Sequence, residues 1–178
     1  LGFPRISSGG RSALRSLRTG LKRLAMTAFS LPGFDLDAFV AATLDEDLGV
    51  GISGGGRDVT SESVIGAQDR FAGVMDSRDA ITVAGLPIAA MFFRRLDPDM
   101  EIEILANEGQ QVAPVTDLMR LTGNARAMLT AERSALNTVQ HLSGIATLTR
   151  SYVDAMSGNA TLLDTRKTIP GLRHLEKY

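Results

Sequence analysis

The stretch LLDTRKTIPGLRHLEKY, residues 162–178, passes from aliphatic to charged side chains within a few positions. Its two leucines are typical of a buried strand that ends at the aspartate. Arg166 and Lys167 follow, and they place a planar guanidinium beside a mobile ammonium, a pair suited to carboxylate or phosphate groups. In α/β barrels, binding and catalytic groups come from the carboxyl ends of the strands. The stretch therefore predicts either a site for an anionic ligand or a solvated basic turn.

The composition limits the class of protein. The chain has 178 residues, of which 44% are hydrophobic, and it has no cysteine. This length and apolar content suit a globular domain with a proper core and argue against a disordered chain. No apolar run is long enough to cross a bilayer, so we expect no membrane partner. Without cysteine there is no disulfide, thiolate metal site or cysteine nucleophile.

The charge is distributed unevenly along the chain. Residues 1–30 carry six basic and no acidic side chains, a net charge of +6. Residues 31–160 carry nine bases and eighteen acids, a net −9, and residues 161–178 carry four bases and two acids, a net +2. Nucleic-acid binding needs a basic face, so the acidic body predicts no nucleic-acid partner.

Residues 1–30 form a basic leader that we expect to lie outside the working fold. Their Arg- and Ser-rich, acid-free composition is typical of an organelle transit peptide. Met26 stands just before the globular pattern begins and is an alternative start. We expect a cytoplasmic location, with organelle targeting by the leader as the alternative.

From residue 31 onward the pattern predicts a mixed α+β unit. Asp35 and Gly49 bracket a short helix as its N-cap and C-cap. Two strands around a polar turn are expected in 70–85, a buried helix in 86–97, and a half-buried strand in 100–114 with a turn at Gly109. Asn124 caps a long helix, and Ser143-Gly144 is a candidate bend in it. That helix carries an apolar stripe: Leu129, Leu136, Val139, Leu142 and Ile145. After Gly158, residues 160–164 are expected to begin a new strand.

The segment GVGISG, residues 49–54, satisfies the GxGxxG pattern of dinucleotide-binding folds. That mechanism needs a strand before the glycines and a helix after them, with its N-terminus facing the pyrophosphate. Here a helix precedes the glycines and a turn-rich segment follows them. We therefore interpret 49–57 as a surface loop.

A second chemically suggestive segment is ERSALN, residues 132–137. Arg133 lies on the long helix between Leu129 and Leu136, and the helical phase predicts that it falls on or beside the buried side. The simplest alternative is an ion pair with Glu132 or another nearby acid.

Together, LTAERSALNTVQHLSGIAT and LLDTRKTIPGLRHLEKY closely resemble the quinolinate phosphoribosyltransferase family. The resemblance runs from about residue 31 to the end and includes DEDLG, RDVTSESVI and VAGLPIA. It implies an α+β N-terminal sandwich domain over 31–140. It also implies that a linking helix and the first strand of an α/β barrel occupy 141–178, with the barrel truncated after that strand. We expect the chain to be a fragment that is inactive alone.

The family resemblance also implies an activity and its residues. The reaction joins quinolinate to phosphoribosyl pyrophosphate with Mg²⁺, giving nicotinate mononucleotide, pyrophosphate and carbon dioxide in NAD biosynthesis. Arg166 corresponds to a quinolinate ligand, Lys167 to the catalytic cation for phosphoribosyl pyrophosphate, and Thr165 to a binding hydroxyl. Arg133 corresponds to the arginine that reaches the site of the neighbouring subunit, so a homodimer or larger homo-oligomer is expected.

Two alternatives stay open at this point. One is a relative of the same fold, of the molybdenum-transport-associated type, acting on another substrate. The other is a non-catalytic dimerisation module. His174 and Lys177 are expected to be structural rather than catalytic.

Overall fold

The computed structural model describes residues 29–158 and 160–178, so the expected leader lies outside the described residues except for its last two positions. The elements, in chain order, are α1 (Leu36–Leu48), α2 (Val59–Val64), β1 (Arg70–Ser77), β2 (Ile81–Thr82), α3 (Leu86–Leu96), β3 (Glu101–Ile104), β4 (Gln111–Val112), β5 (Thr116–Asn124), α4 (Ala125–Met156) and α5 (Arg173–Glu176).

Strand β5 is the centre of the main sheet. It pairs antiparallel with β1 on one side and with β3 on the other, while β2 and β4 form a separate two-stranded ladder. Met75 lies opposite Met119, and both are fully buried, whereas the next pair joins Val74 to exposed Arg120. This alternation gives the sheet one buried and one solvated face.

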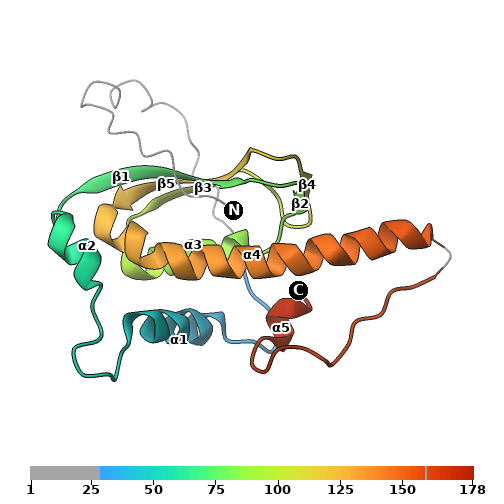
Figure 1. Cartoon of the computed structure of the whole chain (residues 1–178), viewed down its shortest axis with the longest axis horizontal. Coiled ribbons are helices and arrows are strands. Elements are labelled where there is room, and N and C mark those ends of the chain that lie inside the picture. Colours follow the sequence, from blue (N-terminus) through green and yellow to red (C-terminus); the bar gives the residue numbers. More distant parts are fainter. Residues whose placement is uncertain (1–28, 159) are drawn as a thin grey trace.

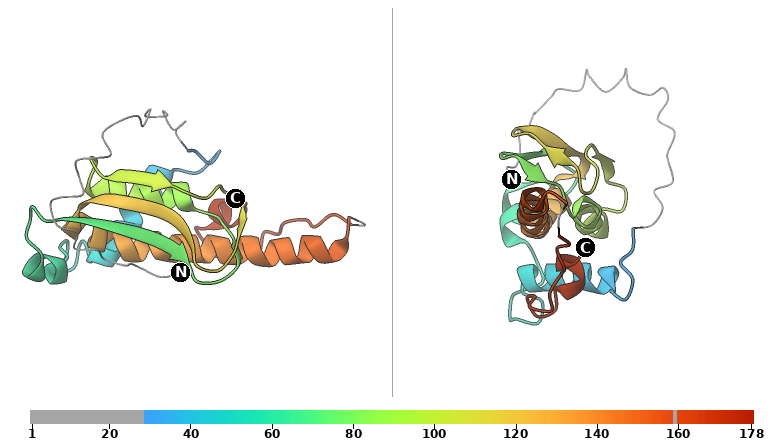
Figure 2. Two further views of the ribbon diagram at one scale, coloured as in Figure 1. Left: turned by 90° about the horizontal axis from the view of Figure 1, so that it is seen from above. Right: turned by 90° about the vertical axis from the view of Figure 1, so that its right-hand side faces the viewer.

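Helices α3 and α4 cover the buried face of the sheet, and α1 packs on the far side of these two helices (Figures 1 and 2). The core lies between sheet and helices, where Phe92 and Phe93 of α3 meet Leu118 and Leu121 of β5 in one buried cluster. The expected α+β sandwich is therefore confirmed. No helix of the described residues is long and apolar enough to cross a bilayer.

The predicted helix ends are confirmed. The Asp35 carboxylate accepts a hydrogen bond from the backbone of Ala38 at 2.9 Å, and Gly49 closes α1 in the left-handed conformation with φ 67°. Asn124 caps α4 by accepting from the Ala127 amide at 3.1 Å. Helix α4 ends at Met156, directly before the left-handed Ser157 and Gly158.

Four features differ from the sequence-based expectation. Residues 160–164 are not a strand: they run without a hydrogen-bonded partner strand among the described residues, and a strand of a parallel sheet needs neighbours to pair with. Helix α4 continues through Ser143 and Gly144 without a break. Strand β5 and helix α2 were not predicted. No strand follows α4 in the described residues, so the expected first strand of the barrel is not seen, and the last element is the short helix α5.

Candidate active site

The segment that carries the predicted cation pair is an exposed loop between α4 and α5. Thr165, Arg166 and Lys167 are all exposed, and the Thr165 hydroxyl accepts a hydrogen bond from the backbone N–H of Lys167 at 3.1 Å. Neither Arg166 nor Lys167 forms a side-chain ion pair with any of the described residues. Two cations without carboxylate partners suit an anionic ligand better than a neutralised surface turn.

Thr165 and Lys167 line a cleft of about 880 Å³ between the loop, the C-terminal half of α4 and the β2–α3 connection. Its α4 wall runs from Leu142 to Val153, and Glu108 and Tyr178 close it on the other side. Arg166 is not among the lining residues. The α4 wall is largely apolar, and the loop contributes Lys167 and Asp164 beside two leucines and two threonines. The cleft therefore offers apolar surface together with both signs of charge.

Arg133 lies in a different cleft, of about 560 Å³, between the first turns of α4, the end of α1 and the start of α2. Its side chain is 75% exposed, so the expectation that it falls on or beside the buried side is wrong. The buried stripe of α4 instead passes through Ala131, Ala135 and Val139, while Leu129 and Leu136 are half-buried and line this cleft. Arg133 lies on the same side of α4 as these two leucines and is exposed to solvent.

The alternative role for Arg133, an ion pair with a nearby acid, is present in the structure. Its Nε lies 3.4 Å from Oδ1 of Asp47 at the end of α1. Glu132, the adjacent residue, has a raised pKa because burial outweighs the opposing charge of Arg133. An exposed pair of this kind contributes little to stability.

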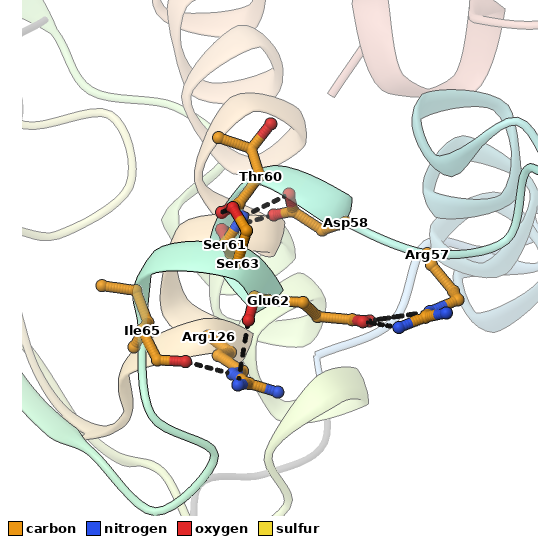
Figure 3. A network of polar contacts seen from close by, with 8 residues as sticks. All are labelled: Arg57, Asp58, Thr60, Ser61, Glu62, Ser63, Ile65 and Arg126. Atoms are coloured by element: carbon orange, nitrogen blue, oxygen red, sulfur yellow. Dashed lines mark hydrogen bonds and ion pairs between the residues drawn. The ribbon is translucent and has the colours of Figure 1, made fainter.

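Figure 3 shows a polar network around α2, in which Arg57 and Asp58 are also lining residues of the Arg133 cleft. Asp58 caps α2 by accepting from Ser61 N at 3.0 Å, and it accepts from the Thr130 hydroxyl of α4 at 2.9 Å. Burial acts to raise the pKa of Asp58, but the hydrogen bonds from Ser61 and Thr130 together bring it below its ordinary value. Arg126 donates to the backbone carbonyl of Ile65 at 2.7 Å, which ties the other end of α2 to α4.

The structure therefore does not bring the four predicted site residues together within one subunit. The two clefts share no lining residue. Their α4 walls are consecutive segments, 129–140 and 142–153, whose centres are about 20 Å apart along the helix axis. One pyridine-sized ligand cannot contact Arg133 of the first cleft and Lys167 of the second.

Helix α5 and its neighbours contribute residues that the sequence did not point to. The Glu176 carboxylate contacts His141 of α4, and Glu108 accepts from the Tyr178 hydroxyl at 2.8 Å. His174 stacks on Phe34 with ring centroids 5.6 Å apart, in line with its expected structural role. These contacts join segments far apart in the chain, so no local sequence pattern predicts them.

Two family models match consecutive parts of the chain. The N-terminal domain of quinolinate phosphoribosyl transferase matches residues 58–143, and the C-terminal domain of the same family matches residues 145–178. Of the two segments that carry the resemblance, 129–147 spans the junction of these matches and 162–178 lies inside the C-terminal one. The chain belongs to the quinolinate phosphoribosyltransferase family.

Relatives of known name support this membership. A probable nicotinate-nucleotide pyrophosphorylase (carboxylating) of Synechocystis is 44% identical over 83% of this chain and 48% of its own length. Quinolinate phosphoribosyltransferase (decarboxylating) 2a, mitochondrial, of Nicotiana tabacum is 34% identical over 94% of this chain and 46% of its own length. The chain thus spans about half the length of the curated relatives it matches.

Solved structures of proteins from this family have a similar fold. The crystal structure of NadC from Streptococcus pyogenes superimposes with a TM-score of 0.77 at 30% identity, covering 84% of this chain and 52% of that one. The nicotinate-nucleotide pyrophosphorylase of Francisella tularensis gives a TM-score of 0.72 at 34% identity, covering 80% and 49%. The sandwich fold of this family member is therefore the one seen in crystals of its relatives.

The described residues contain no cluster of three or more histidines or carboxylates that could hold a metal ion. The carboxylate nearest in sequence to the cation pair, Asp164, lies 2.6 Å from the ammonium of Lys177. Glu176, which follows in α5, is occupied by His141.

Proposed function

We propose that the protein containing these residues is a quinolinate phosphoribosyltransferase of NAD biosynthesis. The pyridine nitrogen of quinolinate would attack the anomeric carbon of phosphoribosyl pyrophosphate, and pyrophosphate would leave with the electrons of the broken bond. The 2-carboxyl group would then leave as carbon dioxide, and a proton would take its place, giving nicotinate mononucleotide. The observation that carries this proposal is the exposed Arg166–Lys167 couple, which has no ion pair among the described residues, within a chain that matches both domains of the family.

The loop residues supply the chemistry that such substrates need. Quinolinate is a dicarboxylate, and the fork of Arg166 suits bidentate carboxylate binding. Phosphoribosyl pyrophosphate is polyanionic, and Lys167 would stabilise the charge that develops on the departing pyrophosphate as the ribose becomes oxocarbenium-like. Thr165 would donate a hydroxyl hydrogen bond to a phosphate or carboxylate oxygen. Holding both anions also aligns the attacking nitrogen with the ribose carbon.

We propose further that Arg133 serves the site of a second subunit in a homodimer or larger homo-oligomer. Its high exposure and its place in a cleft separate from Lys167 support this arrangement. An arginine that points to solvent is available to a neighbouring subunit, and the weak pair with Asp47 holds it without neutralising it completely.

The division of the chain near residue 140, the cytoplasmic location and the Mg²⁺ requirement stay predictions. The relative from Nicotiana tabacum is named mitochondrial, so the organelle alternative stays open as well.

The direct test is release of carbon dioxide from carboxyl-labelled quinolinate by the product of the complete reading frame. The assay contains phosphoribosyl pyrophosphate and Mg²⁺, and nicotinate serves as comparison substrate. We expect release that needs both substrates, and little product from nicotinate. A folded protein that releases no carbon dioxide would rule out the proposed reaction.

A further inference from the structure

The loop that carries Arg166 and Lys167 depends on α5 for its shape. Arg173 of α5 donates to the carbonyl of Arg166 at 3.4 Å and to the hydroxyl of Thr168 at 3.3 Å. Lys177 pairs with Asp164 at 2.6 Å, at the start of the loop. Because the loop has no regular secondary structure of its own, these contacts decide where its cations lie.

Helix α5 is in turn anchored on the sandwich. Leu175 is 3% exposed and joins the main core, and Tyr178 donates to Glu108. Glu108 also accepts from the first amides of α3, at Gly85 and Leu86, so the anchor reaches a rigid element. The short helix thus lies between the sandwich and the cation-bearing loop.

The Glu176 side chain of α5 contacts both helix α4 and the loop that carries the cations. Its Oε1 lies 3.0 Å from Nε2 of His141 on α4, and its Oε2 accepts from the backbone N–H of Ile169 at 3.1 Å. Ile169 is two residues after Lys167. The Glu176 side chain is only 10% exposed, whereas in the other carboxylate contact to the loop Asp164 is 65% exposed and Lys177 31%. Ile169 itself is 50% exposed, so this hydrogen bond is shielded from solvent only at its carboxylate end. A hydrogen bond to a charged group is nevertheless stronger than an exposed ion pair.

We propose that Glu176, held by His141, is a positioning residue that fixes the loop so that Arg166 and Lys167 point their charges at the substrates. The role rests on the proposed function. Without the carboxylate, the Ile169 N–H loses its acceptor and the loop can move away from the geometry in which the cations meet both anions. A displacement of the cations by about 1 Å from that geometry is costly for binding and alignment of the substrates.

The test compares Glu176→Ala, Glu176→Gln and His141→Ala in the complete protein. For Glu176→Ala we expect KM for both substrates to rise about tenfold while kcat changes less, and exchange of backbone hydrogens over 162–172 to become about tenfold faster, the size expected for losing a hydrogen bond to a charged group. Glu176→Gln keeps one acceptor for Ile169 and should show smaller changes in both readouts. His141→Ala should loosen the same peptide, and its effect should not add to that of Glu176→Ala.

Glu103→Ala is the matched control, since Glu103 is an exposed carboxylate that pairs with Arg120 on the solvated face of the sheet. It should leave KM and loop exchange unchanged. Unchanged KM and unchanged exchange in the Glu176 variants would overturn the proposal, and so would a fall in kcat alone with faster exchange throughout the sandwich. If Glu176→Ala does not fold, Glu176→Gln decides by the same criteria. An inactive wild-type protein would refute the proposed reaction, whereas the exchange comparison would still test the positioning of the loop.

Discussion

Glu132 and Arg133 are neighbours in sequence with opposite surroundings. Arg133 is largely exposed, while Glu132 is half-buried in the wall of the same cleft, and burial raises the pKa of its carboxyl. A raised pKa in the folded state means that the folded protein binds this proton more strongly than the unfolded chain does. Its contribution to stability is therefore complete below the unfolded value of about 4.3 and is lost as the pH rises through the folded pKa.

Glu132→Gln should remove this dependence. We expect the variant to have a higher free energy of unfolding than the wild type at pH 7, and the difference to shrink towards pH 4, where both side chains are neutral. Urea denaturation at several pH values measures it. Glu46→Gln, at an exposed position of α1, provides the baseline for losing one surface carboxylate. A difference that grows on acidification would show that Glu132 is stabilised as the anion.

At the scale of elements, α2 is a six-residue helix that is too short to be stable alone. It is held by its cap and by α4, through Asp58 at one end and Arg126 at the other. We expect Asp58→Ala to lower the free energy of unfolding by about 2 kcal/mol, about 1 for the lost cap and about 1 for the lost bond to Thr130. Chemical denaturation measures the loss.

Asp58→Asn is the control, because asparagine caps helices about as well as aspartate does and should cost less. A double-mutant cycle with Thr130→Val isolates the contact between the two helices. Additive losses in that cycle would mean that the Asp58–Thr130 contact does not couple α2 to α4.

The elements that the sequence predicted are those whose signals are local. Asp35 and Asn124 lie at the N-terminal ends of helices, and a cap needs only the next three residues. Strand β5 was missed because Leu118 and Met119, adjacent in the chain, are both buried, which breaks the alternation that marks a half-buried strand. The register of β1 against β5 shifts at the same place, because Met75 pairs with Met119 and the next residue, Asp76, pairs with Asp117.

The candidate site was predicted in its residue types and not in its geometry. A family pattern identified Arg133, Thr165, Arg166 and Lys167, but it could not say that Arg133 lines one cleft while Thr165 and Lys167 line another. The exposure of Arg133 depends on which face of α4 the sheet covers, and small residues such as Ala131 and Ala135 decide that face. The contact between Glu176 and His141 spans 35 positions, beyond the reach of any spacing rule.

At the scale of the whole molecule, α4 connects both clefts, running under the sheet and extending beyond it (Figure 1). A site that needs Arg133 and Lys167 together must then be completed by two chains. In a two-fold symmetric dimer, each chain would give Arg133 to its partner's site and keep its own Lys167.

This arrangement predicts complementation between two inactive variants of the complete protein, Arg133→Ala and Lys167→Ala. In a mixed dimer one site receives both substitutions and the other receives neither. Free exchange of equal amounts makes half of the dimers mixed, so about a quarter of the wild-type carbon dioxide release should return. Mixing Arg166→Ala with Lys167→Ala is the matched control: both residues come from one loop, every site then carries a defect, and activity should not return. Exchange of subunits, followed by mass spectrometry of differently tagged chains, must be demonstrated in both mixtures. If exchange is complete and the Arg133→Ala mixture stays inactive, Arg133 acts within its own subunit or not at all.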